Sequence, residues 1–310
     1  MEALARAGID ITGNVLRYAE VEQSGREFRL LRLGSCDFDF DVAEALWQPE
    51  AHPHLPTVSE ALADVFAGSG AVRYQLTVHP PGCYSFFTPL PSGISETTRK
   101  VRIQQEASLL AGVETPLRLM ADPAYSDAAE GAERVDWVHV LAVPEHVYTR
   151  FEEVLRVLVE QPHPRLTPRP RLMASMQAAA AAMEHLLHRA LPGPDAPFAL
   201  AVGWYPTHVE YTLCRGAQWY YSHFTVAGTP ADAVYYGVAL LQRLHLRPSQ
   251  VGRVYLYGIT PPAETAPILE RVFSRPAERL NPLAVIDLDA DSLTEDFDAV
   301  AYVPCMGAAL

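Results

Sequence analysis

One hairpin pattern occurs twice in this chain, and the repeat limits how the chain can fold. Near the N-terminus an apolar strand, a polar turn and an alternating strand fill residues 8–22. The same order recurs over residues 198–221. A gapless alignment of the two stretches places Asp10 against Ala201. Two copies of one hairpin predict two similar halves, each opened by its own copy.

Length and composition agree with a folded protein of two domains. A chain of 310 residues exceeds one domain of about 150 residues. Hydrophobic residues make up 49% and charged residues 20%, so the chain can build buried cores. The formal net charge of −13 argues against a nucleic-acid partner, since phosphate neutralisation needs a basic surface. The same charge argues against adsorption to anionic lipid.

The chain also lacks the sequence signals of secretion, metal frameworks and membrane insertion. Its four cysteines are far apart and none forms a CxxC pair, which indicates buried thiols in a reducing compartment. No apolar run approaches the ~18 residues of a membrane span, and the N-terminal apolar stretch is too short for a signal peptide. We therefore expect a cytoplasmic protein without direct membrane insertion.

The first half is expected to start as an α/β unit over residues 1–80. A third strand should follow the hairpin, and then a helix over residues 57–66, with Thr57 as N-cap and Glu60 completing a capping box. A strand over residues 74–78 returns to the sheet through this helical crossover, so it should pair in parallel with the first strand.

Three further segments complete the predicted organisation. Residues 81–161 should form an inserted α+β lobe of a strand, a helix with Ser95 as its cap, two more strands and a second helix. Residues 162–192 contain a proline-rich connector and an alanine-rich helix from Leu172, expected to cross between the halves. Residues 193–310 repeat the order of the first half and include a predicted strand over residues 284–288.

Several motifs together resemble one protein family. They are Gly8-Ile9-Asp10-Ile11 with residues 15–22, Pro91-Ser92-Gly93-Ile94 with residues 99–107, and Asn281-Pro282-Leu283 with residues 299–310. In this order they are similar to PilM-type type IV pilus assembly proteins, which belong to the FtsA-like branch of the actin, Hsp70 and sugar kinase superfamily. The resemblance spans nearly the whole chain. It implies an α/β fold of duplicated actin-like (ribonuclease H-like) halves, with a small α+β lobe inserted in the first half.

The resemblance also implies where a nucleotide site would lie. In the superfamily the turn of each opening hairpin touches the nucleotide phosphates, and a glycine turn contacts the adenosine. The positions of this sequence that match are Asp10, Thr12, Gly13, Asn14, Gly203 and Gly258. We interpret them as the remains of a cofactor-binding site.

Those positions depart from the pattern of active members. Thr12 stands where a glycine is expected, which adds a side chain at the closest approach to phosphate. The second turn lacks its Asp, reads Ala201-Val202-Gly203, and continues with Trp204 and Tyr205. Gly258 is a single glycine followed by two prolines where a glycine pair is expected. We therefore predict no bound cofactor and disfavour ATP with magnesium.

Other candidate sites have simpler interpretations. A carboxylate bonded within its own turn is preferred for Asp10 over a magnesium ligand. His185 and His188 lack the spacing and the further ligand of a metal site, so we predict no metal there. No GxSxG pattern supports a hydrolase. The charged helix over residues 99–106 is interpreted as a solvated face rather than an interaction surface.

The sequence thus predicts a non-catalytic actin-like assembly protein of a type IV pilus or type II secretion-like system. The resemblance implies that it binds the cytoplasmic tail of an inner-membrane partner, near the junction of the first half with the lobe, and is recruited to the membrane by it. A homo-oligomer is compatible with this interpretation. The alternative is an active ATP-binding and ATP-hydrolysing filament protein. A sugar kinase needs a catalytic Asp near the second hairpin, and none stands there.

Overall fold

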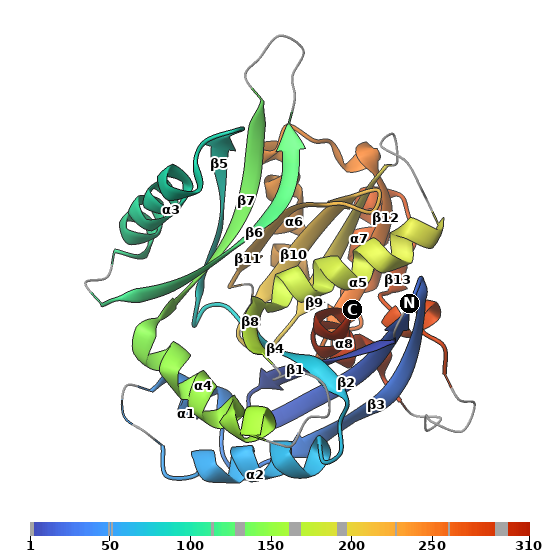
Figure 1. The fold of residues 1–310 in the computed structure, drawn as a ribbon. Coiled ribbons are helices and arrows are strands. Elements are labelled where there is room, and N and C mark those ends of the chain that lie inside the picture. Colours follow the sequence, from blue (N-terminus) through green and yellow to red (C-terminus); the bar gives the residue numbers. More distant parts are fainter. Residues whose placement is uncertain are drawn as a thin grey trace.

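The part of the chain that the structure describes contains two five-stranded sheets and one three-stranded sheet (Figure 1). The computed structural model describes residues 3–48, 50, 52–112, 115–127, 134–160, 169–190, 197–226, 228–259, 261–288 and 297–310. Most of the predicted connector, residues 162–168, lies outside this part. Within the described residues, no helix has both the length and the apolar character needed to cross a membrane.

The first half is built on a sheet of strand order β3-β2-β1-β4-β8. Its strands are β1 (Leu4–Thr12), β2 (Val15–Ser24), β3 (Glu27–Asp37), β4 (Ala71–Val78) and β8 (Arg169–Ala174). Antiparallel pairing of β1 with β2 and parallel pairing with β4 confirm the predicted meander and crossover. The crossover contains α1 (Val42–Trp47) and α2 (Leu55–Val65), whose apolar residues join the core under the sheet.

The second half repeats this topology with strand order β11-β10-β9-β12-β13. Its strands are β9 (Phe198–Trp204), β10 (Val209–Arg215), β11 (Trp219–Thr225), β12 (Val251–Gly258) and β13 (Ala277–Arg279). The helices α6 (Pro230–Arg243) and α7 (Thr265–Phe273) supply residues to its core. The matching order of strands confirms the duplication predicted from the two hairpins.

The lobe is a three-stranded antiparallel sheet with one helix of its own. Its elements are β5 (Tyr84–Pro91), α3 (Glu96–Ala111), β6 (Leu117–Asp127) and β7 (Val135–Pro144), in the sheet order β5-β7-β6. The Ser95 side chain accepts a hydrogen bond from the Thr98 N–H, which confirms the predicted cap of α3. Ile103 of α3 is buried with Leu90 and Val140 of the sheet.

The helix that follows the lobe packs on the first half. We expected α4 (Glu145–Glu160) to be the second helix of the lobe, but its main neighbour is α2. Phe151 and Leu155 of α4 are buried in the core of the first half. The helix was grouped with the lobe because it is adjacent in sequence, and sequence adjacency does not reveal which sheet a helix covers.

Three local predictions are wrong. The helix expected from Thr57 begins two residues earlier as α2, with a proline in its first turn and no side-chain cap, because proline is favoured at a helix start. Leu172 belongs to β8 rather than to a helix, and it pairs with Leu76 of β4. The strand predicted over residues 284–288 is replaced by a short 3-10 helix, Pro282–Val285, and β13 takes the edge position instead.

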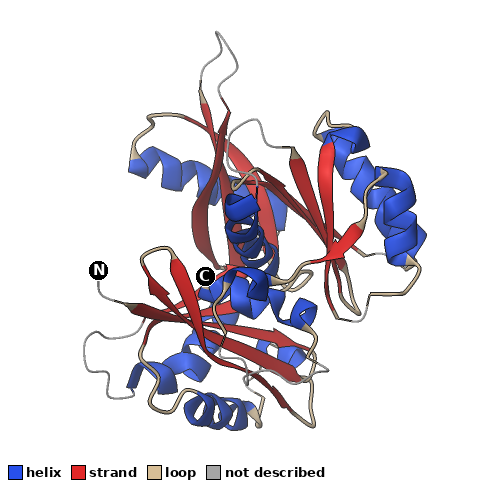
Figure 2. Ribbon diagram, turned by 90° about the vertical axis from the view of Figure 1, so that its right-hand side faces the viewer, coloured by secondary structure: helices blue, strands red, loops and turns tan. Residues whose placement is uncertain are grey.

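Two helices cross between the large sheets and hold the halves together. α5 (Ser175–Ala190) and α8 (Val303–Ala309) pack against each other, and α8 also contacts β1, β2 and β4 of the first half (Figures 1 and 2). A Cβ at Gly307 of α8 would collide with the carbonyl oxygen of Ala178 in α5. This close approach agrees with the expectation that the alanine-rich helix crosses the interface.

Adding one methyl group at this crossing should therefore destabilise the protein. Gly307→Ala is expected to lower the free energy of unfolding by about 1–3 kcal/mol, the usual cost of overpacking a tight contact. The measurement is urea unfolding followed by far-UV circular dichroism. Gly70→Ala is the matched control, because a Cβ at Gly70 meets no atom within 4 Å. An equal midpoint for Gly307→Ala and the wild type would contradict the packing described.

The lobe contacts the second half through an aromatic seam. Its members are Phe87, Tyr125 and His139 of the lobe and Trp219, Tyr220 and Tyr221 of β11. Phe87 stacks on Tyr221 with ring centroids 4.6 Å apart, and Tyr125 stacks on Tyr220 at 4.3 Å. His139 is fully buried, and burial lowers its pKa to about 3. The seam therefore contains a neutral imidazole at neutral pH.

The neutral His139 should make the protein less stable in mild acid. Below pH ~6.5 the unfolded chain binds a proton at this histidine, whereas the folded chain does so only near pH 3. The contribution is therefore fully present above pH ~6.5 and decreases as the pH falls, by about 2 kcal/mol between pH 7 and pH 5. Urea unfolding of wild type and His139→Gln at both pH values measures it. Identical pH dependence in the two proteins would count against the buried neutral state.

Candidate functional site

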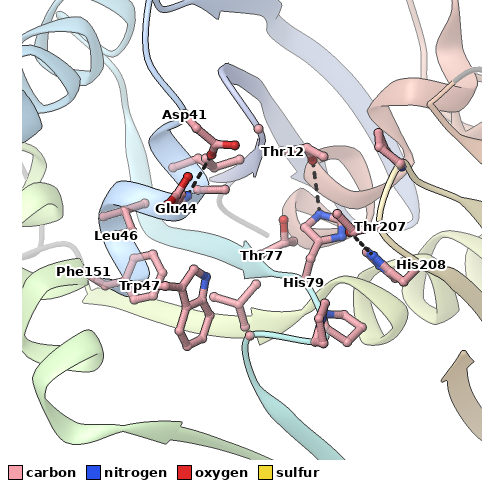
Figure 3. Close-up of a pocket in the computed structure, with 18 residues that line it drawn as sticks. Thr12, Asp41, Glu44, Leu46, Trp47, Thr77, His79, Phe151, Thr207 and His208 are labelled. Atoms are coloured by element: carbon pink, nitrogen blue, oxygen red, sulfur yellow. Dashed lines mark hydrogen bonds between the residues drawn. The ribbon is translucent and has the colours of Figure 1, made fainter. Parts of the chain in front are cut away.

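The predicted site residue Asp10 lies buried where the ends of β1 and β4 meet. Its Oδ1 accepts a hydrogen bond from the Thr77 hydroxyl of β4 and lies 2.7 Å from His79 Nε2. Its Oδ2 accepts one from the Thr12 hydroxyl at 3.1 Å. Because β1 and β4 are parallel, their carboxyl ends meet at one edge of the sheet, so these side chains converge. Figure 3 shows the three that surround Asp10, namely Thr12, Thr77 and His79.

His79 connects this edge to the second half. Its Nε2–H donates to Asp10, and its Nδ1 lies 3.4 Å from Oε1 of Glu210 in β10. Burial by itself lowers the pKa of this imidazole, but the charge and hydrogen bond of Asp10 and the nearby charge of Glu210 raise it to about 10. His79 therefore carries a positive charge between two carboxylates, one from each half.

Both carboxylates remain ionised although they are fully enclosed. Burial raises their pKa values, but His79 and Thr77 more than offset this for Asp10. For Glu210, the hydrogen bond with His208 and the positive charge of His79 hold the pKa well below its usual range. A buried ion network of this kind is strongly destabilised when one partner is removed.

Glu210 is the centre of the second half's contribution. Oε2 accepts a hydrogen bond from the Tyr257 hydroxyl at 2.7 Å, and Oε1 accepts one from Ser175 at the start of α5. His208 Nε2 lies 3.2 Å from the same Oε1. Hydrogen bonds to Glu210 therefore connect β10 with β12 and α5, next to the position of His79 from the first half.

The second hairpin reaches His79 because its turn lies two residues later than the repeat predicts. A gapless alignment of the two hairpins places the second turn at Trp204 and Tyr205. Instead, the Tyr205 N–H donates to the His208 carbonyl, so the turn lies at Pro206 and Thr207. The longer hairpin places the Tyr205 ring 4.6 Å from the His79 ring and stacks it on His208 at 4.8 Å.

The predicted residues of the first hairpin divide into two groups. Asp10 and Thr12 are part of the ion network. Gly13 lines the adjoining cavity and has φ +59°, a conformation that favours glycine. The Asn14 side chain donates to the Phe38 carbonyl at 3.1 Å and is not among the residues that line the cavity.

The predicted glycines of the second half serve packing. A Cβ at Gly203 would collide with the Tyr257 ring, and one at Gly258 would collide with the Trp204 carbonyl. Gly258 also has φ +96°. Of the two aromatic residues that follow Gly203, Tyr205 is buried beside His79, whereas Trp204 packs on the core of the second half.

Sequence reasoning did not select His79, His208 or Glu210. His79 directly follows β4, and the ends of parallel strands are where sites form. His208 and Glu210 occupy alternate positions before and within β10, so a polar face was visible in the sequence. The carboxylate missing from β9 is supplied by β10, where Glu210 pairs with Gly203.

A cavity of about 320 Å³ opens beside the ion network (Figure 3). Its walls include the β1–β2 turn, α1, Phe151 of α4, the loop after β4 and the tip of the second hairpin. Apart from His79 and His208, the ionisable side chains among the described lining residues are Asp41 and Glu44. Asp41 and Glu44 therefore give the α1 side of the cavity wall two carboxyl groups.

The duplicated sheets, the interposed helices and the inserted lobe define an actin-like fold. A chain of a solved PilM-PilN type IV pilus biogenesis complex is similar over 98% of this chain and 97% of its own length, with 17% identity and a TM-score of 0.70. A Bacteroides thetaiotaomicron protein with an actin-like ATPase fold and unknown function is similar over 91% of this chain and 92% of its own, with 10% identity and a TM-score of 0.52. No family model and no curated protein matches the chain. The similarities confirm the predicted fold class and the structural resemblance to the PilM-PilN complex.

Replacing His79 should destabilise the protein, because two buried carboxylates would then lack a positive partner. His79→Ala leaves Asp10 and Glu210 without the positive charge between them and is expected to lower the free energy of unfolding by about 3–5 kcal/mol. Adding Glu210→Gln to His79→Ala should recover part of this loss, since one buried charge is gone. Urea unfolding of the single and double variants measures the coupling. A double variant less stable than His79→Ala would argue against the charge network.

Proposed function

We propose that this chain is a non-catalytic, actin-like assembly protein of a type IV pilus or type II secretion-like system. It acts in the cytoplasm by binding the cytoplasmic tail of an inner-membrane partner, which recruits it to the membrane. The observation that carries the proposal is the similarity to a chain of the PilM-PilN complex over 98% of this chain. Similarity over the full architecture, lobe included, supports a shared mode of assembly more than a shared chemistry.

The absence of catalysis is proposed from the charges at the junction. A phosphate-binding turn offers backbone N–H groups and positive charge to the ligand. Here His79 is already paired with Asp10 and Glu210, and the lining of the adjoining cavity adds Asp41 and Glu44. Magnesium could offset some of this charge, but no lysine or arginine stands among the described lining residues to hold the phosphates.

The tail is proposed to bind in a groove between the lobe and α4. This tail groove has a volume of about 700 Å³ and is lined by α3, β6 and Tyr148 of α4. β6 is an edge strand of the lobe sheet, so its outer backbone groups are available to an extended peptide. The groove lies at the junction of the lobe with the first half, where the family resemblance places a partner peptide.

The charges of the tail groove favour a tail with acidic side chains. Among its described lining residues, Arg99, Lys100 and Arg118 stand against a single acidic residue, Glu96. The proposal thus departs from the interpretation of residues 99–106 as a solvated face. The Lys100–Glu96 pair is 3.7 Å long and solvent-exposed, so its strength is small and a ligand can displace it. The guanidinium of Arg118 lies 4.9 Å from the centre of the Tyr148 ring, which positions it at the groove wall.

A charge reversal in the tail groove should abolish partner binding. The full chain is tested in pull-downs against cytoplasmic tails of membrane proteins encoded near its gene. Arg99→Glu is expected to weaken tail binding at least about tenfold, because one favourable charge contact becomes repulsive. Arg102→Glu makes the same change on the same helix and should bind normally, since Arg102 does not line the groove. Equal effects of the two variants would place the tail elsewhere, and retention of no tail by the wild type would remove the assembly proposal.

Calorimetric titration with ATP and magnesium separates this function from an active filament ATPase. The assembly protein is expected to give no heat at millimolar nucleotide. Micromolar binding by the wild-type chain would instead support the ATPase. Because this titration does not involve the tail, its outcome is independent of the groove variants.

A further inference from the structure

Three side chains from two halves of the protein converge on one point beside the cavity. His79 follows β4 in the first half, His208 lies in the second hairpin, and Glu210 lies in β10. One nitrogen or oxygen from each of the three lies within 4.8 Å of the others. We propose that His79, His208 and Glu210 bind a single transition-metal ion of the zinc class between the halves.

The distances within this His–His–Glu cluster fit a metal. Zinc binds nitrogen and carboxylate oxygen at about 2.0–2.2 Å in a tetrahedron, whose ligand–ligand edges are then about 3.4 Å. His79 Nδ1 lies 3.4 Å from Glu210 Oε1, and His208 Nε2 lies 3.2 Å from the same oxygen. Two edges of the expected tetrahedron are therefore present before any ion is added.

Two buried polar atoms at the cluster have no hydrogen-bond partner among the residues that the structure describes. Nδ1 of His79 is buried, and its 3.4 Å approach to Glu210 does not have hydrogen-bond geometry. The hydroxyl of Tyr205, whose ring packs on both His79 and His208, is also buried without a partner. Unsatisfied buried polar atoms cost free energy, so two of them beside one point indicate a missing ligand.

The surrounding contacts orient the three ligands as metal sites require. A histidine that binds a metal through one nitrogen usually donates its other N–H to a carboxylate or other oxygen. His79 Nε2 lies 2.7 Å from Asp10, and His208 Nδ1 lies 2.9 Å from the Thr207 hydroxyl (Figure 3). The second oxygen of Glu210 is held by Tyr257. Each ligand thus has its own positioning contact.

The donor set selects the kind of ion. Two imidazoles and one carboxylate suit zinc and its neighbours, whereas magnesium and calcium prefer oxygen donors. His79 and His208 both line the cavity, so the fourth coordination position faces open space that water can occupy. Binding displaces the proton from His79 Nδ1, and the ion then supplies the positive charge between Asp10 and Glu210.

Such an ion would fasten the two halves together without a nucleotide. The first half supplies His79 and the second half supplies the other two ligands. Metal binding should therefore raise the unfolding temperature of the full chain, since only the folded state brings the three ligands together. This consequence does not depend on tail binding.

The test is a cobalt(II) titration of the metal-free full chain. Wild type is expected to bind one equivalent and to show the visible absorption of tetrahedral cobalt, which zinc then displaces. His208→Gln should lose this spectrum. Thr207→Val keeps all three ligands and removes one positioning contact, so it should bind 10- to 100-fold more weakly with an unchanged metal-free unfolding temperature.

His188→Gln is the matched control, because it removes an exposed histidine that lines a different pocket. It should bind cobalt like the wild type. Absence of cobalt and zinc binding by folded wild type would overturn the proposal and leave a protonated His79 as the cation between Asp10 and Glu210. Wild-type binding that survives in His208→Gln, or that is lost in His188→Gln, would also overturn it by placing the ion elsewhere.

Discussion

The positive charge between Asp10 and Glu210 is the interaction on which the junction of the halves depends. Each carboxylate is fully buried and belongs to a different sheet. Without a cation between them, two desolvated negative charges would face each other, and the closed arrangement would be costly. With His79 between them, each carboxylate is attracted to the imidazolium. The hydrogen bonds from Thr77, Tyr257 and Ser175 fix the positions of the two carboxylates. Polar groups that specify one arrangement thereby replace apolar contact at the centre of the molecule.

The overall fold was predictable because the hairpin pattern that indicates it occurs twice along the chain. Each hairpin is a local pattern, and two copies of it predict two similar sheets without any long-range information. The edge strands β8 and β13 were missed for a physical reason. Both are short, and a strand at a sheet edge needs neither strong alternation nor a long apolar run. β8 is followed directly by α5, whose alanine-rich sequence has a high helical propensity. The helix was therefore predicted to begin at Leu172, inside the strand.

The site was predictable only in part. Asp10 and the altered turns could be found because a family pattern indicates where to look. His79 and Glu210 could not, since their meeting depends on how the halves pack and on the shifted turn at Pro206 and Thr207. A single sequence shows that residues before and within β10 alternate polar and apolar. It does not show that the polar face points into a junction rather than into water.

The ion network of Asp10, His79 and Glu210 holds the junction of the two halves closed. A partner is therefore expected to act on another part of the molecule. In the superfamily that the sequence resembles, the hairpin turns of the two halves touch the nucleotide phosphates; here the proposed tail groove lies elsewhere, between α3, β6 and α4. The lobe contacts the second half through the aromatic seam, while α4 is part of the first half's core. An occupant of the groove therefore touches the lobe on one side and the first half on the other. Such an occupant would contact the lobe and the first half without reaching the cavity beside the ion network, which is lined by other residues.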